Sequence, residues 1–530
     1  MTATYDAVVV GAGPNGLVAA NHLMDAGWSV LVLEAQPDVG GAVASDRELH
    51  DDFVHDTFSA FYPLAAASAT IQGFELEKHG LEWVHAPAVL GHLLPSTGQW
   101  AILHRDRQVT AALMDAQHPG DGDAWLALCA EWDRIGPAVV EALLTPFPPV
   151  RAGLSALGRL RSVGGLGFVR QLLMPAADFA RHRFRGAAPQ LLVCGNAGHA
   201  DIPLNAPGSG LMGMLLTMLG QTVGFPVPRG GAGELAQAMA RRLRSGGATV
   251  LCGQEVVAID VENRRATAVR TATGDRYAAR HAVVADVVAS HLYGRLLPAG
   301  ALPERLRSAM RSFEMDPGTV KVDWALSGPV PWREAPPYRA GTVHVADSVE
   351  QMAEALHQVS SQTIPAKPFL LTGQMTTTDP TRSPVGTESL WAYTHVPQQV
   401  ARDAGDGSVR GVWDDSDCER FADRMQHRIE QLAPGFGDLV LARRILGPRE
   451  LESRNANLVG GGVNGGTAQL HQQLVFRPVP GLGRAETPVR GLYLGSASAH
   501  PGGGVHGACG HNAARAAILH RRTSLARRSR

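Results

Sequence analysis

Residues 6–34 read DAVVVGAGPNGLVAANHLMDAGWSVLVLE and set the architecture of the chain. The apolar run Asp6–Val10 leads straight into the glycine-rich turn GAGPNG, a helical stretch follows and stops at Gly27, and a second apolar run ends at Glu34. Strand, glycine turn, helix, strand and acid within about 30 residues predict a βαβ unit that binds a dinucleotide.

Each part of this unit has a physical task. Gly11 permits the tight turn, Gly13 lets a pyrophosphate approach the backbone, and Gly16 lets the helix lie close to the strand. The start of the helix offers N–H groups and a partial positive charge to the phosphates. Glu34 is placed to accept hydrogen bonds from both ribose hydroxyls, and its charge disfavours a 2′-phosphate there.

A second glycine turn follows the acid. Residues 35–43 read AQPDVGGAV and place Gly40 and Gly41 shortly after Glu34. This resembles the extended motif of two-dinucleotide-binding flavoproteins, in which the second turn passes near the ribityl-pyrophosphate. The resemblance favours FAD over NAD as the dinucleotide.

Two remote segments are expected to complete the same unit. Residues 228–250 hold another glycine-rich entry and an amphipathic helix over 234–244, followed by strands that include Gln254–Ile259. Near the C-terminus, Gly491–Leu494 is predicted to be a buried strand, and the glycines at 502–504 lead into a helix that runs toward Ile518. The start of that helix can stabilise negative charge on a reduced flavin ring.

The chain resembles the phytoene desaturase-like flavoprotein family, and most of all its pyridine nucleotide-disulfide oxidoreductase domain-containing branch. The motifs that carry the resemblance are VVVGAGPNGLVAA, LVLEAQPDVGGA, PRGGAGELAQAMA and YLGSASAHPGGGVHGACGHNAA, supported by DPTRSPVGTESLWAYTHVP and GGTAQLHQQLVFRPVPG. The resemblance implies bound FAD. The expected FAD-contacting residues are Gly11, Gly13, Pro14, Asn15, Gly16, Glu34, Ala35, Gly40, Gly41, Val256, Gly495, Gly503, Gly504 and Val505.

The sequence departs from this family at two places. Ala42 stands where carotenoid desaturases carry an arginine in GGRA, and the segment VVAD, which ends at Asp286, lacks the proline with which the family commonly continues. These changes bear on carotenoid specificity more than on FAD. No cysteine pair has CxxC spacing, so dithiol redox chemistry and a zinc site are not expected, and no metal site is predicted.

The predicted fold class is α/β. It combines a discontinuous, glutathione-reductase-type two-dinucleotide-binding (Rossmann-like) FAD domain with an α+β substrate domain that has a mixed sheet and a helical region. The FAD domain is assigned to residues 1–100, 226–300 and 484–520, and the substrate domain to 101–225 and 301–483. The basic segment 521–530 is predicted to be a frayed tail, with a tether to anionic lipid as the alternative.

The composition of the chain excludes some classes of binding partner. With 48 basic and 49 acidic residues the net charge is −1, which argues against nucleic acid. No apolar run approaches the roughly 18 residues needed to span a bilayer. Five scattered cysteines fit a reducing cytoplasm. We therefore expect a cytoplasmic protein, of bacterial source from its Ala, Gly and Arg content, with a small apolar or amphipathic substrate and peripheral membrane contact as an open alternative.

Candidate catalysts are fewer than cofactor contacts. His500 and His506 flank the C-terminal glycine turn and are the first candidates for proton transfer, and His55 in FVHDTFS follows the second glycine turn. For all three a structural role is the competing interpretation. Trp391, Tyr393 and His395 would share one face of a strand, as pocket lining or as core. The Met- and Leu-rich segment 211–219 allows the same two interpretations.

The expected activity is an FAD-dependent oxidoreductase that acts on C–C bonds of a largely apolar substrate by hydride transfer to flavin N5, as a desaturase or dehydrogenase, a saturase or an isomerase. One alternative is a flavin amine oxidase, because that class shares the cofactor domain. A second alternative is an FAD-bound interaction protein without turnover, because the sequence offers no obvious strong base.

Overall fold

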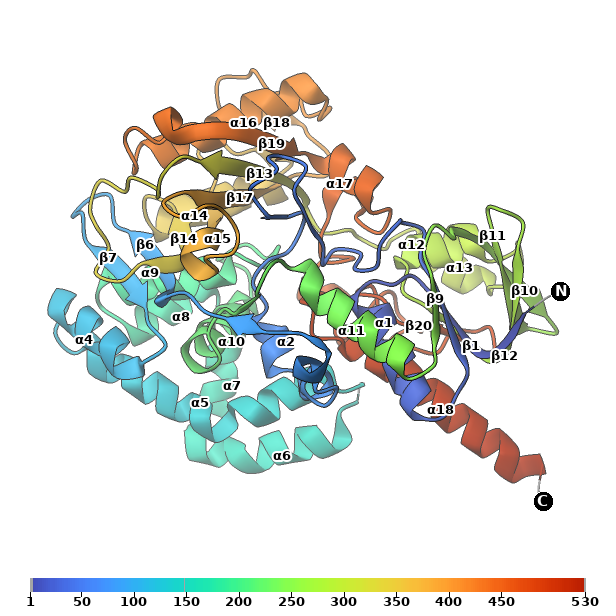
Figure 1. Ribbon diagram of the computed structural model, residues 1–530. Helices are drawn as coiled ribbons and strands as arrows, with labels where there is room; N and C mark the ends of the chain where they lie inside the picture. The colour runs from blue at the N-terminus through green and yellow to red at the C-terminus, as the bar shows by residue number, and fades with distance from the viewer. Residues whose placement is uncertain (1–2, 147, 529–530) are drawn as a thin grey trace.

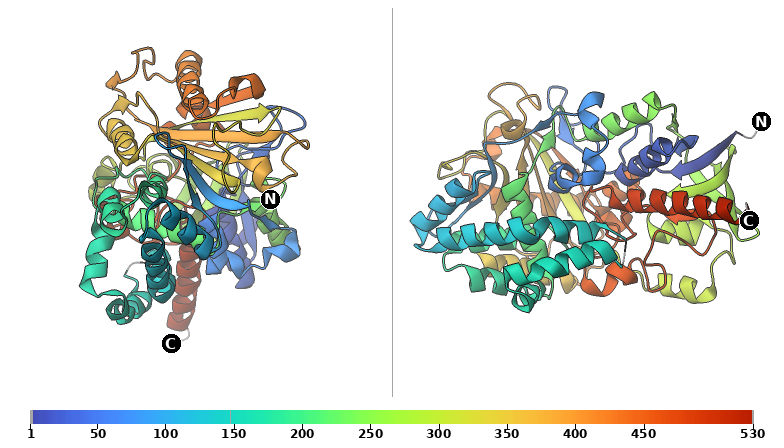
Figure 2. Two further views of the ribbon diagram at one scale, coloured as in Figure 1. Left: turned by 90° about the vertical axis from the view of Figure 1, so that its left-hand side faces the viewer. Right: turned by 90° about the horizontal axis from the view of Figure 1, so that it is seen from below.

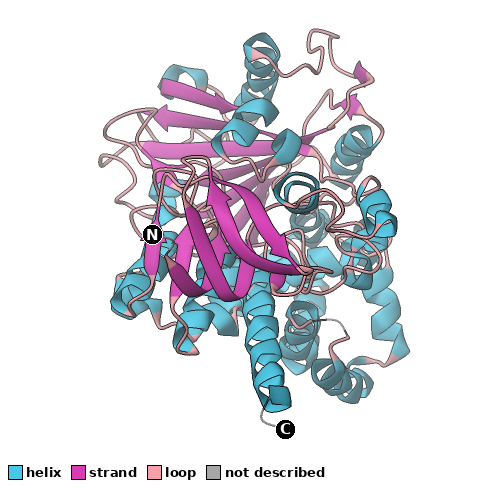
Figure 3. Ribbon diagram, turned by 90° about the vertical axis from the view of Figure 1, so that its right-hand side faces the viewer, coloured by secondary structure: helices cyan, strands magenta, loops and turns pink. Residues whose placement is uncertain are grey.

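The computed structural model describes residues 3–146 and 148–528. Two seven-stranded sheets form the centres of two units, the first on the right and the second at the upper left of Figure 1. Figure 3 shows the two groups of strands with helices around them. The predicted α/β fold class with a Rossmann-like unit is confirmed.

The first sheet has the order β10-β11-β12-β1-β2-β9, with β20 beside β12. Its bounds are β1 (Thr4–Val10), β2 (Val30–Leu33), β9 (Thr249–Leu251), β10 (Val256–Glu262), β11 (Arg265–Thr271), β12 (Arg276–Ala285) and β20 (Leu492–Leu494). Strands β9, β2, β1, β12 and β20 run parallel. A parallel sheet is covered on both faces, which explains the unbroken apolar runs in β1 and β2.

Helices from distant parts of the chain cover one face of this sheet: α1 (Pro14–Asp25), α11 (Gly233–Ser245) and α18 (Ala508–Arg528). On the other face, side chains of β1 and β2 cluster with those of β10 and β11 from the edge of the sheet and with α12 (Ala289–His291) and α13 (Glu304–Met310). Helix α18 continues to Arg528, into the basic segment 521–530, and residues 529–530 lie outside the described part. The frayed tail stays a prediction.

The second sheet has the order β19-β13-β17-β16-β14-β6-β7 and is antiparallel except between β14 and β6. Its bounds are β6 (Ala88–Leu93), β7 (Trp100–Leu103), β13 (Gly318–Leu326), β14 (Ala340–Val345), β16 (Leu370–Gln374), β17 (Glu388–Val396) and β19 (Val440–Leu446). One face packs against α16 (Asp415–Glu430). Because β6 belongs to this sheet, the boundary between the units lies before Ala88, not at residue 100.

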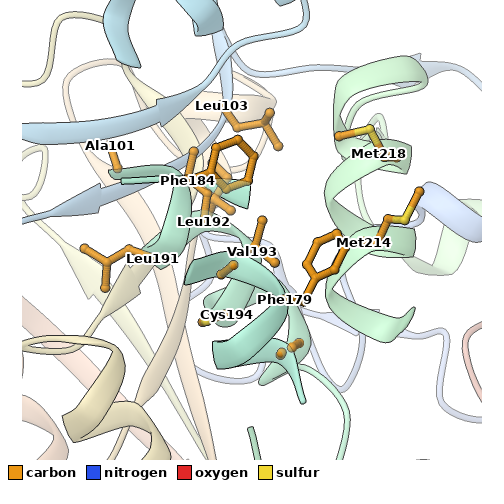
Figure 4. Close-up of a cluster of buried hydrophobic side chains, with 14 of the residues drawn as sticks. Ala101, Leu103, Phe179, Phe184, Leu191, Leu192, Val193, Cys194, Met214 and Met218 are labelled. Carbon is orange, nitrogen blue, oxygen red and sulfur yellow. The ribbon is translucent and has the colours of Figure 1, made fainter. Parts of the chain in front are cut away.

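A helical layer covers part of the other face, below the second sheet in Figure 1. It contains α4 (Arg107–Gln117), α5 (Asp121–Leu144), α6 (Val150–Leu160), α7 (Leu166–Leu173), α8 (Ala176–Arg183), α9 (Ala187–Ala197) and α10 (Ser209–Thr222). Met214 and Met218 of α10 are fully buried and face the apolar cluster around Phe179 and Val193 (Figure 4). These two methionines are therefore core residues.

Short elements lie where the chain passes between the two units. They are β3 (Ser45–Asp46), β4 (His55–Asp56), α2 (Pro63–Ala67), α3 (Ala69–Gln72), β5 (Trp83–Val84), β8 (Val227–Pro228) and α17 (Pro448–Arg454). Between strands of the second sheet the chain adds α14 (Val349–Ser360), β15 (Thr363–Ile364), α15 (Met375–Thr378) and β18 (Arg402–Asp403). Strands β5 and β8 pair with each other where the chain passes between the units.

Candidate functional site

The first glycine turn joins β1 to α1. Gly11 has a φ of 93°, which favours glycine, and a Cβ at Gly16 would lie 2.1 Å from the Gly11 carbonyl oxygen. Gly13 is the N-cap of α1 and brings no capping side chain, and Pro14 is the first helical residue. The turn thus exposes backbone at a helix N-terminus, where anions bind.

Glu34 lies at the end of β2, next to this turn. Its buried carboxylate accepts the N–H of Ala12 at 2.6 Å and the N–H of Gln36 at 2.9 Å. Burial raises the pKa of Glu34. Each carboxylate oxygen has two acceptor sites, so capacity for hydroxyl donors is left. Ala35 follows in an exposed position, and the segment that leads to buried Val256 donates to the Glu34 carbonyl oxygen at 2.7 Å.

The second glycine turn packs directly on the first. The Gly40 N–H donates to the Ala12 carbonyl oxygen at 2.9 Å, and a Cβ at Gly41 would lie 3.0 Å from Cα of Gly13. Both Gly40 and Gly41 have positive φ. Any side chain at Gly41 would enter the space over the first turn, which agrees with a cofactor running across both turns.

The C-terminal segment closes the same region. The Gly495 N–H donates to the Ala285 carbonyl oxygen at 2.8 Å, beside the end of β12. A Cβ at Gly510 would lie 1.9 Å from the Asn15 carbonyl oxygen, so α18 and α1 can approach only because residue 510 is glycine. The start of α18 is thereby fixed on the start of α1.

The turn before α18 is tightly constrained. A Cβ at Gly503 would lie 2.8 Å from Oδ1 of Asn464, and one at Gly504 would lie 2.7 Å from Cδ1 of Leu64. Val505 has a φ of 55°, an uncommon backbone conformation for a β-branched residue. Such strain is concentrated at functional sites, because the surrounding structure must hold it in place.

Asp286 is a member of this site that the sequence did not identify as functional. Its carboxylate accepts the Gly16 N–H at 2.8 Å, in the first turn of α1, and its Oδ2 would lie 2.7 Å from a Cβ at Gly13. Burial, together with the nearby charge of Glu34, raises the pKa of Asp286 to about 7, although the Gly16 bond lowers it. The Asp286 carboxyl group, which is half protonated near pH 7, therefore lies at the helix terminus where an anion would bind.

The two histidines that flank the turn have different contacts. His506 is buried, and its Nδ1 accepts the Ala508 N–H at 3.0 Å, so it caps α18. Burial lowers the pKa of His506 to about 4. His500 makes a 3.1 Å contact from Nε2 to the Thr145 carbonyl oxygen, and its Nδ1 has no partner among the described residues. Since a carbonyl can only accept, Nε2 carries the proton and Nδ1 is an acceptor in the neutral ring.

His55 lies at the junction of the two units. Its Nδ1 is 3.3 Å from Oγ of Ser389, and its Nε2 is buried without a partner among the described residues. Burial lowers the pKa of His55 to about 4, partly opposed by the charge of Asp323. The ring is therefore neutral at pH 7.

The face of the second sheet opposite α16 carries polar and aromatic side chains. Trp391, Tyr393 and His395 share this face of β17, with ring centroids 5.9 Å and 5.8 Å apart along the row. Lys321 of β13 is paired with Tyr393 in the register and shares the face. The predicted common face is confirmed; whether it contacts substrate stays a prediction.

A buried ion network continues from Lys321. Its ammonium group hydrogen-bonds to Asp323, and Asp323 also accepts from Arg444 at 2.8 Å. Arg444 reaches Asp46, near the second glycine turn, at 2.7 Å. Burial by itself would raise the pKa of Asp323, but the two cations hold it below its usual range. The network ties the second sheet to the first unit.

Two cavities of this structure differ in their linings. One, of about 590 Å³, has a mixed lining: apolar residues such as Leu144 and Leu219, charged residues such as Glu141 and Arg515, and the start of α18. The other, of about 470 Å³, is lined by His395 and by more polar residues, including Asp201 and Glu314. The Asp201 carboxylate is already bonded to residues 467 and 468. His500 is not in the lining of the larger cavity, but its partner Thr145 is.

The site fits a dinucleotide in two respects. The two glycine turns pack so closely that a Cβ at Gly13, Gly16 or Gly41 would clash with Asp286, Gly11 or Gly13, and glycines in this arrangement let a pyrophosphate approach the backbone. The side-chain oxygen of Asn15 is buried at the start of α1 and has no hydrogen-bond partner among the described residues. Buried polar atoms are rarely left unpaired, so a donor outside the protein chain is expected there.

Comparison with known proteins agrees with this geometry. Residues 9–74 match the model of the NAD(P)-binding Rossmann-like domain, and residues 158–394 match that of flavin containing amine oxidoreductases. The chain is an FAD-dependent oxidoreductase that is similar to flavin amine oxidases and desaturases. The predicted FAD cofactor is thus confirmed, while the individual contact residues stay predictions.

Comparisons with individual proteins support the same conclusion. The chain is 28% identical to mouse pyridine nucleotide-disulfide oxidoreductase domain-containing protein 2, over 96% of this chain and 92% of the relative, which confirms the predicted branch. It is 26% identical to the neurosporene-forming phytoene desaturase of Cereibacter sphaeroides, over 56% and 54% of the two chains. A solved putrescine oxidase variant superimposes with a TM-score of 0.61 at 16% identity, over 98% and 100% of the chains, and shows the shared fold.

Two further predictions concern the cellular location and the source organism of the protein. No helix in residues 3–146 and 148–528 is long and apolar enough to cross a membrane. The expected cytoplasmic location and bacterial source stay predictions.

Proposed function

We propose that this FAD-dependent oxidoreductase removes hydrogen from neighbouring carbon atoms of a largely apolar substrate and so converts a C–C single bond into a double bond, as a dehydrogenase or desaturase. The main support is the 590 Å³ cavity beside the C-terminal glycine turn. Its lining includes Trp132, Val140, Leu144 and Leu219, which suit the apolar part of a ligand, together with charged residues such as Glu141 and Arg515. The likeness to a protein that is named a phytoene desaturase points the same way.

The chain has three tasks in such a reaction. When bound, FAD supplies the redox chemistry. The apolar part of the cavity wall excludes water and orients the substrate carbon chain. Desaturation also releases a proton, and His500 is the group we assign to accept it. Its Nδ1 is an unpaired acceptor, and burial lowers its pKa, so the ring is neutral and ready to bind a proton at pH 7.

The test is anaerobic reduction of the bound flavin, followed by its absorbance. Terpenes and polyenes should bleach the flavin, and the Val140→Glu variant should slow bleaching because it places a charge in the cavity wall. Val385→Glu is the matched control, since Val385 is fully exposed outside the cavity. A protein with bound FAD that no C–H donor reduces would count against the proposal and favour an interaction protein without turnover.

The role of His500 has its own test. Loss of a general base lowers rates by roughly 10²- to 10⁴-fold. The His500→Gln variant should reduce the flavin-bleaching rate within that range while FAD content stays unchanged. An unchanged rate in this variant would remove His500 from the mechanism.

Amine oxidation is the second candidate. Support comes from the family match over residues 158–394 and from the polar cavity, where Glu314 could pair with an ammonium group. Amines would then bleach the flavin and release peroxide in air, and Glu314→Gln would weaken amine binding. Apolar substrates would have no effect, which separates the two proposals in one series of measurements.

A further inference from the structure

Helix α6 turns its apolar side toward solvent. Val150, Leu154 and Leu157 follow the i, i+4, i+7 spacing of one helix face, and their exposed fractions are 63%, 64% and 61%. Only Ala152 of this helix is fully buried. A surface helix of a globular protein normally has the opposite arrangement, with its large apolar residues facing the core.

All charged side chains in the same part of the chain are basic. Residues 142–177 contain Arg151, Arg159, Arg161 and Arg170 and no Asp or Glu. All four arginines are exposed, and none forms an ion pair with a described residue. Since the whole chain has a net charge of −1, this is a local excess of positive charge.

The exposed apolar residues of α6, with Arg151 beside them and Arg161 directly after the helix, form one surface, here called the α6 surface. Leu166, at the start of α7, adds a further leucine that is 83% exposed. In the view from below (Figure 2, right), α6 and α18 both lie toward the viewer. The α6 surface therefore shares a side of the molecule with the helix that ends in the basic C-terminal segment.

The larger cavity adjoins this surface along the chain. Leu144, Thr145 and Pro146 line the 590 Å³ cavity, and α6 begins only four residues later, at Val150. A layer that covers the α6 surface would consequently lie near the wall of the cavity formed by the end of α5.

From these observations we propose that the α6 surface docks on an anionic lipid bilayer. Amphipathic helices with leucines on one side and arginines around them bind in the headgroup region, where the leucines reach the acyl chains and the arginines pair with phosphates. A second copy of the chain is a poor alternative, because a symmetric dimer through this surface would bring two sets of arginines together. Delivery of an apolar substrate from lipid into the cavity rests on the proposed function; docking does not.

The test is flotation of the FAD-loaded protein with lipid vesicles. We expect it to bind vesicles of phosphatidylcholine with phosphatidylglycerol, to bind pure phosphatidylcholine at least tenfold more weakly, and to be released by high salt. The double variants Leu154→Gln/Leu157→Gln and Arg151→Gln/Arg161→Gln should each lose at least tenfold in binding. Val385→Gln is the matched control, because it removes an exposed apolar side chain elsewhere. Unchanged FAD content and thermal midpoint show that each variant is folded.

Three outcomes would overturn the proposal. The first is a wild-type protein that ignores anionic vesicles. The second is binding that survives both α6 double variants and is lost when residues 525–530 are removed, which would assign the lipid contact to the C-terminal segment. The third is a lipid-free dimer, seen by analytical ultracentrifugation, that the leucine variants convert to monomer. None of these measurements uses a substrate, so failure here is distinct from failure of the proposed reaction.

Discussion

The predicted cofactor site of the first unit is formed mainly by backbone atoms, whereas the second unit presents side chains on the sheet face that is predicted to line the substrate region. Glycines at 13, 16 and 41 let the two turns pack closely, and a Cβ at any of them would clash with Asp286 or with the backbone of these turns. The second sheet instead presents Trp391, Tyr393 and His395, and it is joined to the first unit by buried ion pairs. A backbone site fixes the cofactor in many relatives, while a side-chain site can change with the substrate.

The largest effect should come from a second buried ion network between the units, which is centred on Arg382 and is separate from the network of Lys321. Arg382 is fully buried and bonds to Asp56 at 2.9 Å and to Asp379 at 2.8 Å. Arg382→Ala would leave two buried carboxylates without their cation, at a cost of about 3–5 kcal/mol in the free energy of unfolding. Urea unfolding measures the change. Arg307→Ala, at an exposed pair within one helix, should leave the midpoint unchanged; equal midpoints for both variants would contradict this role of Arg382.

The second effect concerns the first glycine turn. Gly16→Ala places a Cβ 2.1 Å from the Gly11 carbonyl oxygen, which forces α1 away from β1 at a cost of about 1–3 kcal/mol. FAD affinity, measured by quenching of flavin fluorescence, should fall by at least tenfold. Gly27→Ala is a useful comparison, since Gly27 has open space around it but a φ of 77°: it should cost stability without weakening FAD binding. Normal FAD affinity in Gly16→Ala would show that the turn does not hold the cofactor.

These two predictions also mark what the sequence could reveal. The glycine turns and Glu34 lie within a short segment whose spacing reports a local backbone path, so the sequence predicted them. Arg382 and Asp56 are 326 positions apart, and Gly16 and Asp286 are 270 apart, so only the fold brings them together. The same limit explains the misplaced unit boundary, because β6 joins the second sheet through β14, which is remote in the chain.

A smaller effect should depend on pH. Asp286 has a pKa raised from 3.8 to about 7, so the folded state binds its proton between pH 4 and 7 while the unfolded state does not. Stability therefore falls as pH rises through this window and is fully reduced above pH 7. A bound pyrophosphate also favours neutral Asp286, so FAD affinity should drop severalfold between pH 6 and pH 8. Asp286→Asn should flatten this slope in a fluorescence titration; the same slope in that variant would assign it to another group.

The smallest effect tests whether the two histidines near the glycine turn have different tasks. His506 accepts the Ala508 N–H and so caps α18, a contact worth about 1 kcal/mol. His506→Ala should lower the free energy of unfolding by about that amount, and His506→Asn should restore part of it, because an amide oxygen can accept the same N–H. Flavin reduction should change little in either variant, in contrast to His500→Gln. If His506→Asn restores stability but leaves flavin reduction slow, then His506 also transfers a proton, and the division between a capping and a catalytic histidine is wrong.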